Sequence, residues 1–387
     1  MKKVRINAKA AKELAHYAPW VYRSDIVSAM EFEAGELVEV VDEKDRFLAV
    51  GYINPASTIA LRVLSFKNVP INRAFFKTRI LRAAARRVDI PSDACRLIHS
   101  EADFLPGLVV DRYGEYLSVQ FTTAGMMRFY ETVLDILVEV IEPAGMIVRG
   151  EEYAFKKEGL EPFVREIGSV PSSVVIEENG VRFYVDLRSS QKTGFYLDQR
   201  RNRKIVTHYI KQRDDVLDCF SNTGGFGLYA KVHKNARVRC VDISEEAIAL
   251  AKQNFDLNEV TGEFVVANVF DYLRELRSTK ERFDLIILDP PSFAKSRSKK
   301  SAAMKGFKDI TVNAMKLVRS EGLIALFSCS HHVGMEDLKR VALQSAKDNG
   351  KMVEVLEHLY QDIDHPYVLG NPYSLYLEGL LLKVIDL

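Results

Sequence analysis

Hydrophobic and polar positions divide the chain into three stretches, and the first of them is rich in short β-type runs. Between Gly35 and Leu64 the runs LVEVV, FLAVGYI and IALRVL are separated by the polar breaks DEKD and NPAS. Turn-forming residues between short β-rich runs predict several strands that close into a small barrel. Trp20, the only tryptophan of the chain, precedes these runs, and we expect it to pack in a core or a lid.

The second stretch mixes helical and strand periodicity. Residues 73–87 predict a helix with six basic and no acidic side chains, and residues 128–141 predict a second helix. Residues 105–121 predict a hairpin whose turn is built around Asp111 to Gly114. MIVRG and SSVVIEENGVRFYVDL then read as further strands. This order predicts a small α+β domain of the strand–strand–helix–strand–strand type.

From about Leu187 onward, short apolar strands alternate with longer amphipathic helices. The expected strands are DDVLDCF, ARVRCVDI, GEFVVANVF, RFDLIILDPP and GLIALFSCS, and a helix follows each of the first four. Runs so rich in Val, Ile and Leu indicate a parallel sheet covered on both faces, a doubly wound α/β domain that binds ligands at the carboxyl ends of its strands. We therefore expect three domains, at residues 1–70, 71–186 and 187–387.

Composition narrows the class of protein. The chain has 387 residues, of which 47% are hydrophobic and 28% charged, as in ordinary globular proteins. The formal net charge of +1 gives no global attraction for polyanions, so any nucleic-acid surface must be a local patch. The four cysteines show no paired spacing, which suggests neither a disulfide framework nor a metal site. With no long apolar segment and no secretory leader, we expect a cytoplasmic protein that does not contact membranes.

Acidic side chains follow three of the expected strands, where a ligand of this fold binds. Asp218 precedes a glycine-rich turn that ends at Gly227, and Asp242 ends the second strand, where a carboxylate accepts the hydroxyls of a ribose. Asp289 is followed by two prolines and a small polar residue. Prolines fix that turn and leave its carbonyl groups able to accept hydrogen bonds from an exocyclic amine.

The glycine-rich turn alone fits a dinucleotide as well as S-adenosylmethionine (SAM). The turn lacks the spacing G-x-G-x-x-G that is typical of dinucleotide sites. An acidic group at Asp218 pairs with an amino-acid ammonium but repels a pyrophosphate. These features favour SAM.

At these residues the chain resembles the class I SAM-dependent methyltransferases. More narrowly, it resembles the bacterial large-subunit rRNA cytosine-5 methyltransferase family, which joins an N-terminal PUA domain to a Rossmann-like catalytic domain. The matching pieces span nearly the whole chain: PWVYRSDI, NPASTIALRVL, DFLPGLVVDRYGEYLSVQ, QKTGFYLDQRRNR, LDCFSNTGGFG, DPPSFAKS, FSCS and DHP. The resemblance implies a PUA-like β-barrel, a small central domain and a seven-stranded catalytic sheet whose last strand is antiparallel.

The same resemblance assigns the cofactor site residue by residue. Asp218 and the turn after it are expected to hold the methionine part of SAM, and Asp242 with Ile243 its ribose and adenine. Asn268 stands where many members carry an acidic residue that faces the adenine amine, and its amide oxygen still accepts from that amine. The full expected set is Gln199, Arg200, Asp218, Ser221, Asn222, Thr223, Gly224, Gly225, Asp242, Ile243, Asn268 and Asp289.

Methylation of cytosine at carbon 5 requires a nucleophile that first adds to carbon 6. Cys329 ends the fifth strand, beside the strand that ends at Asp289, and the resemblance favours it as that thiolate. Asp289 would then bind the base at its ring nitrogen and amine. Cys219 and Cys240 lie within strands and are expected to be buried. His331 and His332 follow Cys329, and we assign them no role.

RNA is the expected partner, and a homodimer is also considered. Three basic stretches are candidates for phosphate contacts: residues 73–87, 191–204 and 294–308. Two alternatives stay open. One is a methyltransferase that acts on an exocyclic base amine through the Asp-Pro-Pro motif, and the other is a non-catalytic ribosome-assembly factor with a vestigial cofactor fold.

Overall fold

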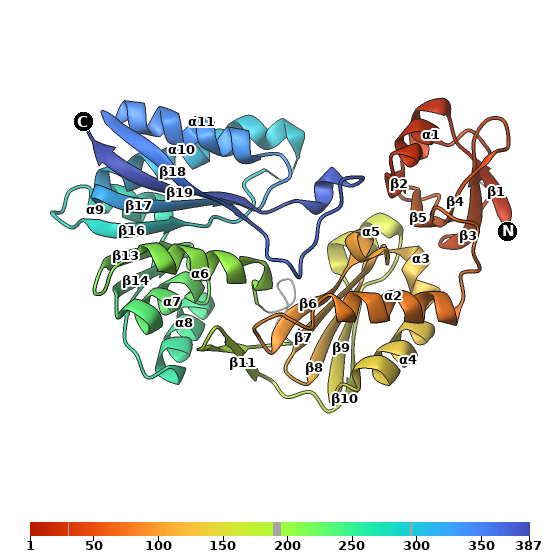
Figure 1. Ribbon diagram of the computed structural model, residues 1–387, viewed down its shortest axis with the longest axis horizontal. Helices are drawn as coiled ribbons and strands as arrows, with labels where there is room; N and C mark the ends of the chain where they lie inside the picture. Colours follow the sequence, from red (N-terminus) through yellow and green to blue (C-terminus); the bar gives the residue numbers. More distant parts are fainter. Residues whose placement is uncertain (30, 189–194, 295) are drawn as a thin grey trace. The chain divides into compact units, whose positions relative to one another are not determined.

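The computed structural model describes residues 1–29, 31–188, 195–294 and 296–387 (Figure 1). These residues form two compact units, and each unit takes segments from distant parts of the chain. The first comprises Met1–Ile176, Val185–Phe195 and Ile363–Ser374, and the second Glu177–Tyr184, Tyr196–Asp362 and Leu375–Leu387. The division into three domains at residues 70 and 186 stays a prediction.

The N-terminal part of the first unit is a five-stranded sheet with the order β1-β3-β4-β5-β2. The three strands expected between Gly35 and Leu64 are confirmed, whereas their closure into a barrel stays a prediction. The pattern missed β1, which pairs in parallel with β3, because only Val4 of its four residues is buried. The elements are β1 (Lys2–Arg5), α1 (Ala8–Ala15), β2 (Trp20–Val21), η1 (Arg23–Asp25), β3 (Glu36–Val41), β4 (Phe47–Ile53) and β5 (Leu61–Ser65).

The rest of the first unit is built on a second five-stranded sheet, with the order β10-β9-β8-β7-β6. Helices α2 and α4 pack on it through an apolar core that includes Phe76, Ile80 and Val133. The elements are α2 (Arg73–Ala85), β6 (Ala94–His99), η2 (Ser100–Asp103), β7 (Leu108–Tyr113), β8 (Tyr116–Phe121), α3 (Ala124–Met127), α4 (Tyr130–Ile141), β9 (Gly145–Gly150), α5 (Glu152–Glu158) and β10 (Phe163–Gly168).

Two expectations for this region are wrong in detail. The hairpin turns at Gly114 and Glu115, since Tyr113 pairs with Tyr116, and Asp111 lies inside β7. Residues 172–187, expected as further strands of the central domain, do not join its sheet and contain a separate two-stranded hairpin of β11 (Val174–Glu178) and β12 (Val181–Val185). The two edge strands of the central sheet are instead β6 and β10, which the sequence pattern did not predict. The pattern hid β10 because none of its residues is fully buried.

The second unit contains a sheet that, among the described residues, holds seven strands in the order β15-β14-β13-β16-β17-β19-β18. All five expected strands are confirmed, and β19 runs antiparallel to both of its neighbours. The strands are β13 (Asp215–Cys219), β14 (Arg237–Asp242), β15 (Glu263–Val266), β16 (Phe283–Leu288), β17 (Val318–Ser328), β18 (Lys351–Tyr360) and β19 (Glu378–Asp386).

Helices cover both faces of this sheet. Figure 1 shows α10 and α11 on one side and α6, α7 and α8 on the other. The face under α9, α10 and α11 forms the largest part of an apolar core that includes Ile286, Phe307 and Leu338. The helices are η3 (Leu197–Gln199), α6 (Arg200–Tyr209), α7 (Gly225–Lys234), α8 (Glu245–Leu257), α9 (Val269–Leu276), η4 (Arg297–Lys299), α10 (Lys300–Leu317), α11 (Met335–Asp348) and η5 (Pro372–Ser374), the last of which belongs to the first unit.

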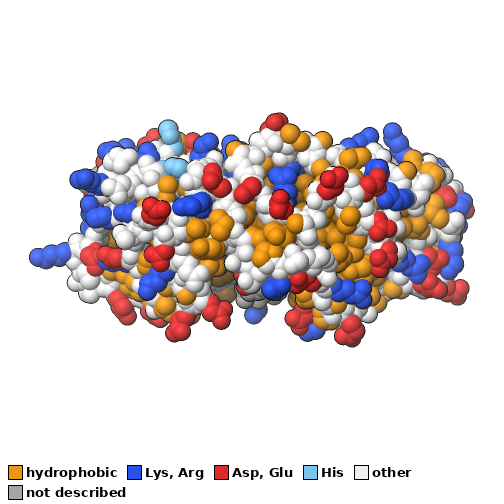
Figure 2. All heavy atoms as spheres, turned by 90° about the horizontal axis from the view of Figure 1, so that it is seen from below, with side chains coloured by type: hydrophobic (Ala, Val, Ile, Leu, Met, Phe, Trp, Pro, Cys, Tyr) orange, Lys and Arg blue, Asp and Glu red, His pale blue; other side chains and the backbone are white. Residues whose placement is uncertain are grey.

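Two observations concern the surface. On the face drawn in Figure 2, acidic and basic side chains are interspersed, in keeping with the formal net charge of +1. Within the described ranges, no helix is both long and apolar enough to cross a lipid bilayer.

Candidate active site

Four predicted site residues lie at one edge of the seven-stranded sheet. The parallel strands β14, β13, β16 and β17 are neighbours, and their registers bring Cys219 beside Leu288 and Leu288 beside Leu326. The carboxyl ends of these strands therefore meet at the same edge. Asp242, Asp218, Asp289 and Cys329 stand there in the order of the strands that carry them.

Asp218 is a buried carboxyl group that lies near two other carboxylates. Its side chain is 2% exposed, and its Oδ2 accepts a hydrogen bond of 2.8 Å from the backbone N–H of Gly227. Burial, with the charges of Asp289 and Asp242, raises the pKa of Asp218 to about 7. A cation bound here would favour the ionised form of Asp218, so the site suits a positively charged ligand.

The turn after Asp218 is held in an unusual backbone conformation. Phe220, Asn222 and Gly224 all have positive φ angles, of 58°, 47° and 79°. The carboxylate of Asp242 supports the turn, because Oδ2 accepts from the backbone N–H of Asn222 at 2.9 Å and Oδ1 accepts from that of Ser244 at 3.0 Å. Each carboxylate oxygen has capacity for a further donor, so Asp242 remains suited to ribose hydroxyls.

The glycines bring helix α7 close to the sheet. A Cβ atom on Gly227 would come within 2.7 Å of a methyl group of Val238, and one on Gly225 within 3.3 Å of the Cδ atom of Arg203. A side chain at Gly227 would push the start of α7 away from Asp218, whose carboxylate its N–H binds. The glycines are therefore needed for packing as well as for access of a ligand.

Two further predicted residues lie beyond Asp242. Ile243 is 69% exposed, although it is a large apolar side chain at a strand end. A flat apolar ring such as adenine would cover it and remove that area from water. The side chain of Asn268 caps α9 by accepting from the backbone N–H of Phe270 at 2.9 Å. Its NH2 group, rather than its oxygen, is the group more readily offered to an adenine ring.

Asp289 is oriented by a chain of amide groups. Nε2 of Gln199 donates to Oδ2 of Asp289 at 3.0 Å, and Nδ2 of Asn202 donates to the Oε1 atom of Gln199 at 2.6 Å. Gln199 and Asn202 are both buried. Gln199, expected at the cofactor, therefore holds Asp289 in place.

Cys329 is half-buried and lies beside the Asp-Pro-Pro turn. Its Sγ atom is 3.8 Å from the carbonyl oxygen of Pro290, which accepts from the thiol. Ser330 ties the same two loops together, because its hydroxyl donates to the carbonyl of Ala294 at 3.0 Å. By contrast, Cys219 and Cys240 are fully buried as expected, and burial raises the pKa of both thiols, which keeps them protonated.

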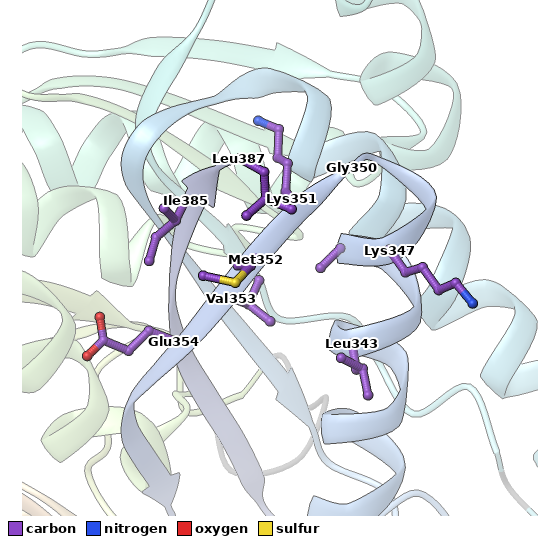
Figure 3. A pocket seen from close by; sticks show the side chains of 10 residues that line it. Leu343, Lys347, Gly350, Lys351, Met352, Val353, Glu354, Ile385 and Leu387 are labelled. Carbon is purple, nitrogen blue, oxygen red and sulfur yellow. The ribbon is translucent and has the colours of Figure 1, made fainter.

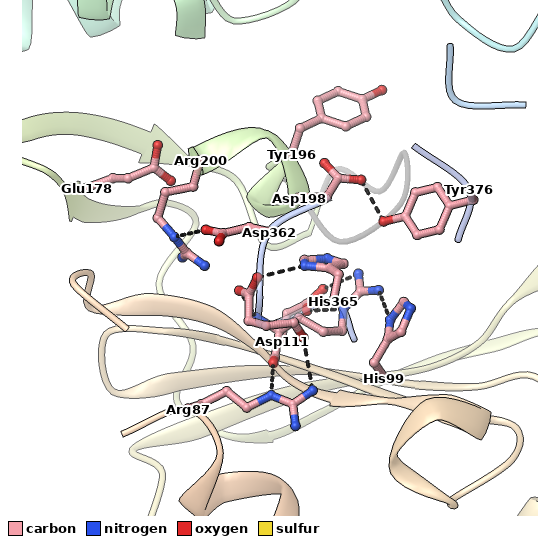
Figure 4. A network of polar contacts seen from close by, with 12 residues as sticks. Arg87, His99, Asp111, Glu178, Tyr196, Asp198, Arg200, Asp362, His365 and Tyr376 are labelled. Atoms are coloured by element: carbon pink, nitrogen blue, oxygen red, sulfur yellow. Dashed lines mark hydrogen bonds and ion pairs between the residues drawn. The ribbon is translucent and has the colours of Figure 1, made fainter. Parts of the chain in front are cut away.

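Two arginines of the run from residue 191 to 203 are buried in ion pairs. Nε of Arg200 lies 2.7 Å from Oδ2 of Asp362, and Figure 4 shows this pair with the hydrogen bond from Tyr376 to Asp198. Arg203 binds Glu178. Residues 191–194 of this predicted basic stretch lie outside the described residues. The structure places Arg200 and Arg203 in the protein interior, which is the wrong place for phosphate contacts.

The other two basic stretches are partly neutralised. In the stretch 73–87, Arg73 and Lys77 pair with Glu139, and Arg86 and Arg87, which follow α2, pair with Asp103. In the stretch 294–308, Lys300 pairs with Asp337 and Lys308 with Asp348. Lys299 and Lys305 are exposed there and are the better candidates for phosphate contacts.

Sequence reasoning missed the residues that hold Arg200, Arg203 and Gln199 in place. Glu178 and Asp362, which hold Arg203 and Arg200, and Asn202, which holds Gln199, carried no motif. Asn254 is fully buried and donates to the carbonyl of Thr223 in the glycine turn at 3.0 Å. The sequence signal that could have found it is a polar residue at the helical spacing of Ile248 and Ala251, on the apolar face of α8.

A pocket of about 560 Å³ lies elsewhere in the second unit (Figure 3). Its walls come from α11, the start of β18 and the end of β19, and they include Leu343, Met352 and Ile385. In the register of β17 and β19, Ser328 pairs with Glu378 and Leu323 with Lys383, so the end of β19 lies toward the amino end of β17. The pocket is therefore at the opposite edge of the sheet from Cys329.

The residues at the carboxyl edge fit SAM. Asp218, Asp242 and Asp289 bring three carboxyl groups together, and the raised pKa of Asp218 reflects the negative charge of the other two as well as burial. The positively charged ammonium and sulfonium groups of SAM would balance that negative charge. Asp242 offers acceptors to a ribose and Ile243 an apolar surface to adenine.

Comparisons with known proteins agree with this geometry. Residues 4–66 match a PUA-like domain, and residues 167–356 match an S-adenosylmethionine-dependent methyltransferase domain. The ribosomal RNA large subunit methyltransferase I of Pseudoalteromonas atlantica is 36% identical over 99% of both chains, and that of Tolumonas auensis 38% identical over 99% of both. The solved structure of SMU.776, a methyltransferase complexed with SAH, superposes with a TM-score of 0.87 at 21% identity over 99% of this chain and 100% of that one. This last likeness establishes the shared fold.

Proposed function

Because this chain belongs to the ribosomal RNA large subunit methyltransferase I family and uses SAM, we propose that it methylates carbon 5 of a cytosine in large-subunit rRNA. The observation that carries the proposal is the place of Cys329, whose Sγ atom lies 3.8 Å from the Pro290 carbonyl beside Asp289. A thiol at this edge stands where a base must enter to meet the methyl donor. The alternative of a non-catalytic assembly factor has no use for these residues.

Each residue has a distinct task in this reaction. The Cys329 thiolate adds to carbon 6 of the cytosine, which makes carbon 5 nucleophilic. SAM supplies the methyl group, which carbon 5 accepts while S-adenosylhomocysteine leaves. A water molecule then takes the proton from carbon 5, the electrons of that C–H bond restore the aromatic ring, and the bond between Sγ and carbon 6 breaks to release the Cys329 thiolate. Asp289 hydrogen-bonds the base at its ring nitrogen and amine.

The hydrogen bond from Gln199 supports the role of Asp289. Because Nε2 of Gln199 donates a hydrogen bond of 3.0 Å to Oδ2 of Asp289, the rotation of this carboxyl group is restricted before any base binds. A positioned hydrogen-bonding group raises the rate of addition by holding the base in the geometry of attack. Arg200 and Arg203 contribute to the site through the protein interior rather than by touching the cofactor or the RNA.

The base must leave its helix for this chemistry, because carbon 6 is hidden in a stacked duplex. We assign the substrate contacts to the PUA-like domain, to the central domain and to the exposed cations Lys299 and Lys305. The three-domain division at residues 70 and 186 is part of this proposal.

A trapping experiment tests the proposal. RNA that carries 5-fluorocytosine cannot lose a proton from carbon 5 after methyl transfer, so the wild-type enzyme should remain covalently attached to it. Cys329→Ala should neither methylate nor trap, while it binds SAM as the wild type does. Cys95→Ala, which changes a buried cysteine of the first unit, is the matched control and should keep both activities.

One outcome would move the chemistry to another atom. If Cys329→Ala keeps near-normal turnover, the thiolate mechanism is wrong. Transfer to an exocyclic base amine, held by Asp289 and the carbonyl of Pro290, would then be the better account.

A further inference from the structure

Residues 363–374, which we call the return loop, leave the second unit and become part of the first. Buried polar groups anchor the start of the loop. The backbone N–H of Arg96 donates to Oδ2 of Asp364 at 2.9 Å, and Nη2 of Arg87 donates to the backbone carbonyl of Asp364 at the same distance. Asp364 is 0% exposed. The loop is therefore fixed to the central sheet by groups that have no contact with solvent.

The remainder of the return loop is a tight turn that lies on the PUA-like domain. Val368 and Asn371 pair as an isolated bridge, and the hydroxyl of Ser374 accepts from the N–H of Val368 at 2.9 Å and donates to the carbonyl of Asn371 at 2.6 Å. A Cβ atom on Gly370 would lie 2.4 Å from the carbonyl oxygen of Tyr17, so the loop backbone touches the end of α1. Hydrogen bonds within the turn and its contact with Tyr17 therefore brace it.

This braced turn presents large apolar side chains to solvent. Leu369 is 90% exposed, Tyr367 53% and Tyr373 50%, and Tyr17 beneath the loop is 68% exposed. The ring of Tyr373 stacks on Trp20, with centroids 5.8 Å apart and planes inclined by 24°. We call these five side chains the aromatic patch. Single exposed apolar residues are common, but several gathered on a braced loop mark an interaction surface.

Two basic side chains lie close in the sequence to residues of the aromatic patch. Lys12 is exposed in the last turn of α1, five residues before Tyr17, and Arg23 is exposed three residues after Trp20. Aromatic rings that carry hydroxyl groups and stand beside cations fit nucleotides, because bases stack on the rings while phosphates meet the positive charges. An apolar tip such as Leu369 is also the type of side chain that wedges between stacked bases.

We propose that the aromatic patch binds unstacked bases of single-stranded RNA. The proposal rests on the proposed function, in that RNA is the substrate, and deepens it by naming a surface outside the catalytic edge. Tyr367 and Tyr373 provide stacking faces, and Leu369 separates two neighbouring bases. The patch holds RNA bases unstacked, whereas Cys329 and Asp289 act on the extruded base.

Binding of a fluorescent RNA to the full chain tests this. The probe is a single strand of about 12 nucleotides, within the range that such surfaces cover, with 2-aminopurine at its centre. The double variant Tyr367→Ala, Leu369→Ala should bind the strand about tenfold or more weakly and should change the 2-aminopurine emission less than the wild type does. Its affinity for SAM and the salt dependence of RNA binding should not change, because no cation is removed.

The control variant Tyr153→Ala, Leu343→Ala removes a tyrosine and a leucine that are also largely exposed, from helices α5 and α11, and should bind as the wild type does. Wild-type affinity and emission in the test variant would overturn the proposal. Loss of co-sedimentation with large ribosomal subunits at unchanged RNA affinity would also overturn it, in favour of a protein partner. Since the assay needs no methyl transfer, weaker RNA binding supports the patch even if trapping at Cys329 fails.

Discussion

The guanidinium of Arg203 and the carboxylate of Glu178 face each other with almost no access to water. Nε of Arg203 donates to Oε1 of Glu178 at 2.8 Å and Nη2 to Oε2 at 2.9 Å, and the two side chains are 3% and 0% exposed. Nη1 of Arg203 also donates to the carbonyl of Tyr196 at 3.1 Å. Because Arg203 also packs on Gly225, this ion pair supports the glycine-rich turn that follows Asp218.

Removal of one partner of this pair should strongly destabilise the protein. Glu178→Ala leaves a buried guanidinium without its counter-ion, and such changes cost about 3–5 kcal/mol. Urea unfolding followed by circular dichroism would measure the loss. Glu139→Ala is the matched control, because Glu139 pairs with exposed Arg73 and should cost less than about 1 kcal/mol. Equal losses in the two variants would mean that the buried pair adds nothing beyond a surface pair.

Asp242 should control the affinity for SAM. Asp242→Ala removes a charged acceptor for the ribose and also frees the backbone N–H groups of Asn222 and Ser244, so we expect binding to weaken about tenfold or more. Isothermal titration calorimetry is the direct measurement. Asp271→Ala changes an exposed carboxylate on α9 and should bind SAM normally. Unchanged affinity in Asp242→Ala would remove Asp242 from the site.

The raised pKa of Asp218 predicts a pH-dependent stability in the absence of SAM. Between its ordinary pKa of 3.8 and its folded value of about 7, the folded protein holds a proton that the unfolded chain has lost. This group therefore contributes stability at low pH that is lost as pH rises through about 7. Asp218→Asn, which keeps an acceptor for Gly227, should show a Tm above that of the wild type by an amount that grows from pH 4 to pH 8, at about 2–4 °C for each kcal/mol.

The same variant should lose SAM. Ionised Asp218 is the form that binds an ammonium, so the affinity of the wild type should fall as pH drops below about 7. Asp218→Asn should bind weakly at every pH. A Tm difference that does not vary with pH, or a SAM affinity that is flat between pH 6 and 8, would contradict the place given to Asp218.

Lys299 and Lys305 should contribute phosphate contacts. Replacing both with alanine should weaken binding of single-stranded RNA and reduce the slope of log affinity against log salt by about 1.4, since each contact to a single strand contributes about 0.7. The control is Lys77→Ala with Lys300→Ala, which removes two lysines that already pair with Glu139 and Asp337. A slope identical to that of the wild type would mean that Lys299 and Lys305 make no contact with phosphate.

The sequence could predict what is local and apolar. β13, β14, β16 and β17 are largely apolar strands with an Asp or Cys at or directly after their last residue, so both the strands and their chemistry are visible in one window. β18 exposes Met352 and Val355 at the sheet edge, so its pattern resembles a surface segment.

Partners that are distant along the chain could not be predicted. Glu178 is 25 residues from Arg203, and Asp362 is 162 residues from Arg200. No spacing rule links such pairs, because their contact depends on the complete fold. An arginine in a basic run therefore looks like a phosphate ligand until its buried carboxylate is known.

The return loop also has a consequence for how the protein is made. Residues 1–176 are synthesised before the return loop. The carboxylate of Asp364 binds the backbone N–H of Arg96 in β6, although Asp364 follows Arg96 by 268 residues in the sequence. The first unit is therefore complete only after Asp364 has left the ribosome. A fragment that stops at residue 186 would lack this segment, and its central sheet would carry an unsatisfied edge at the point where Asp364 belongs.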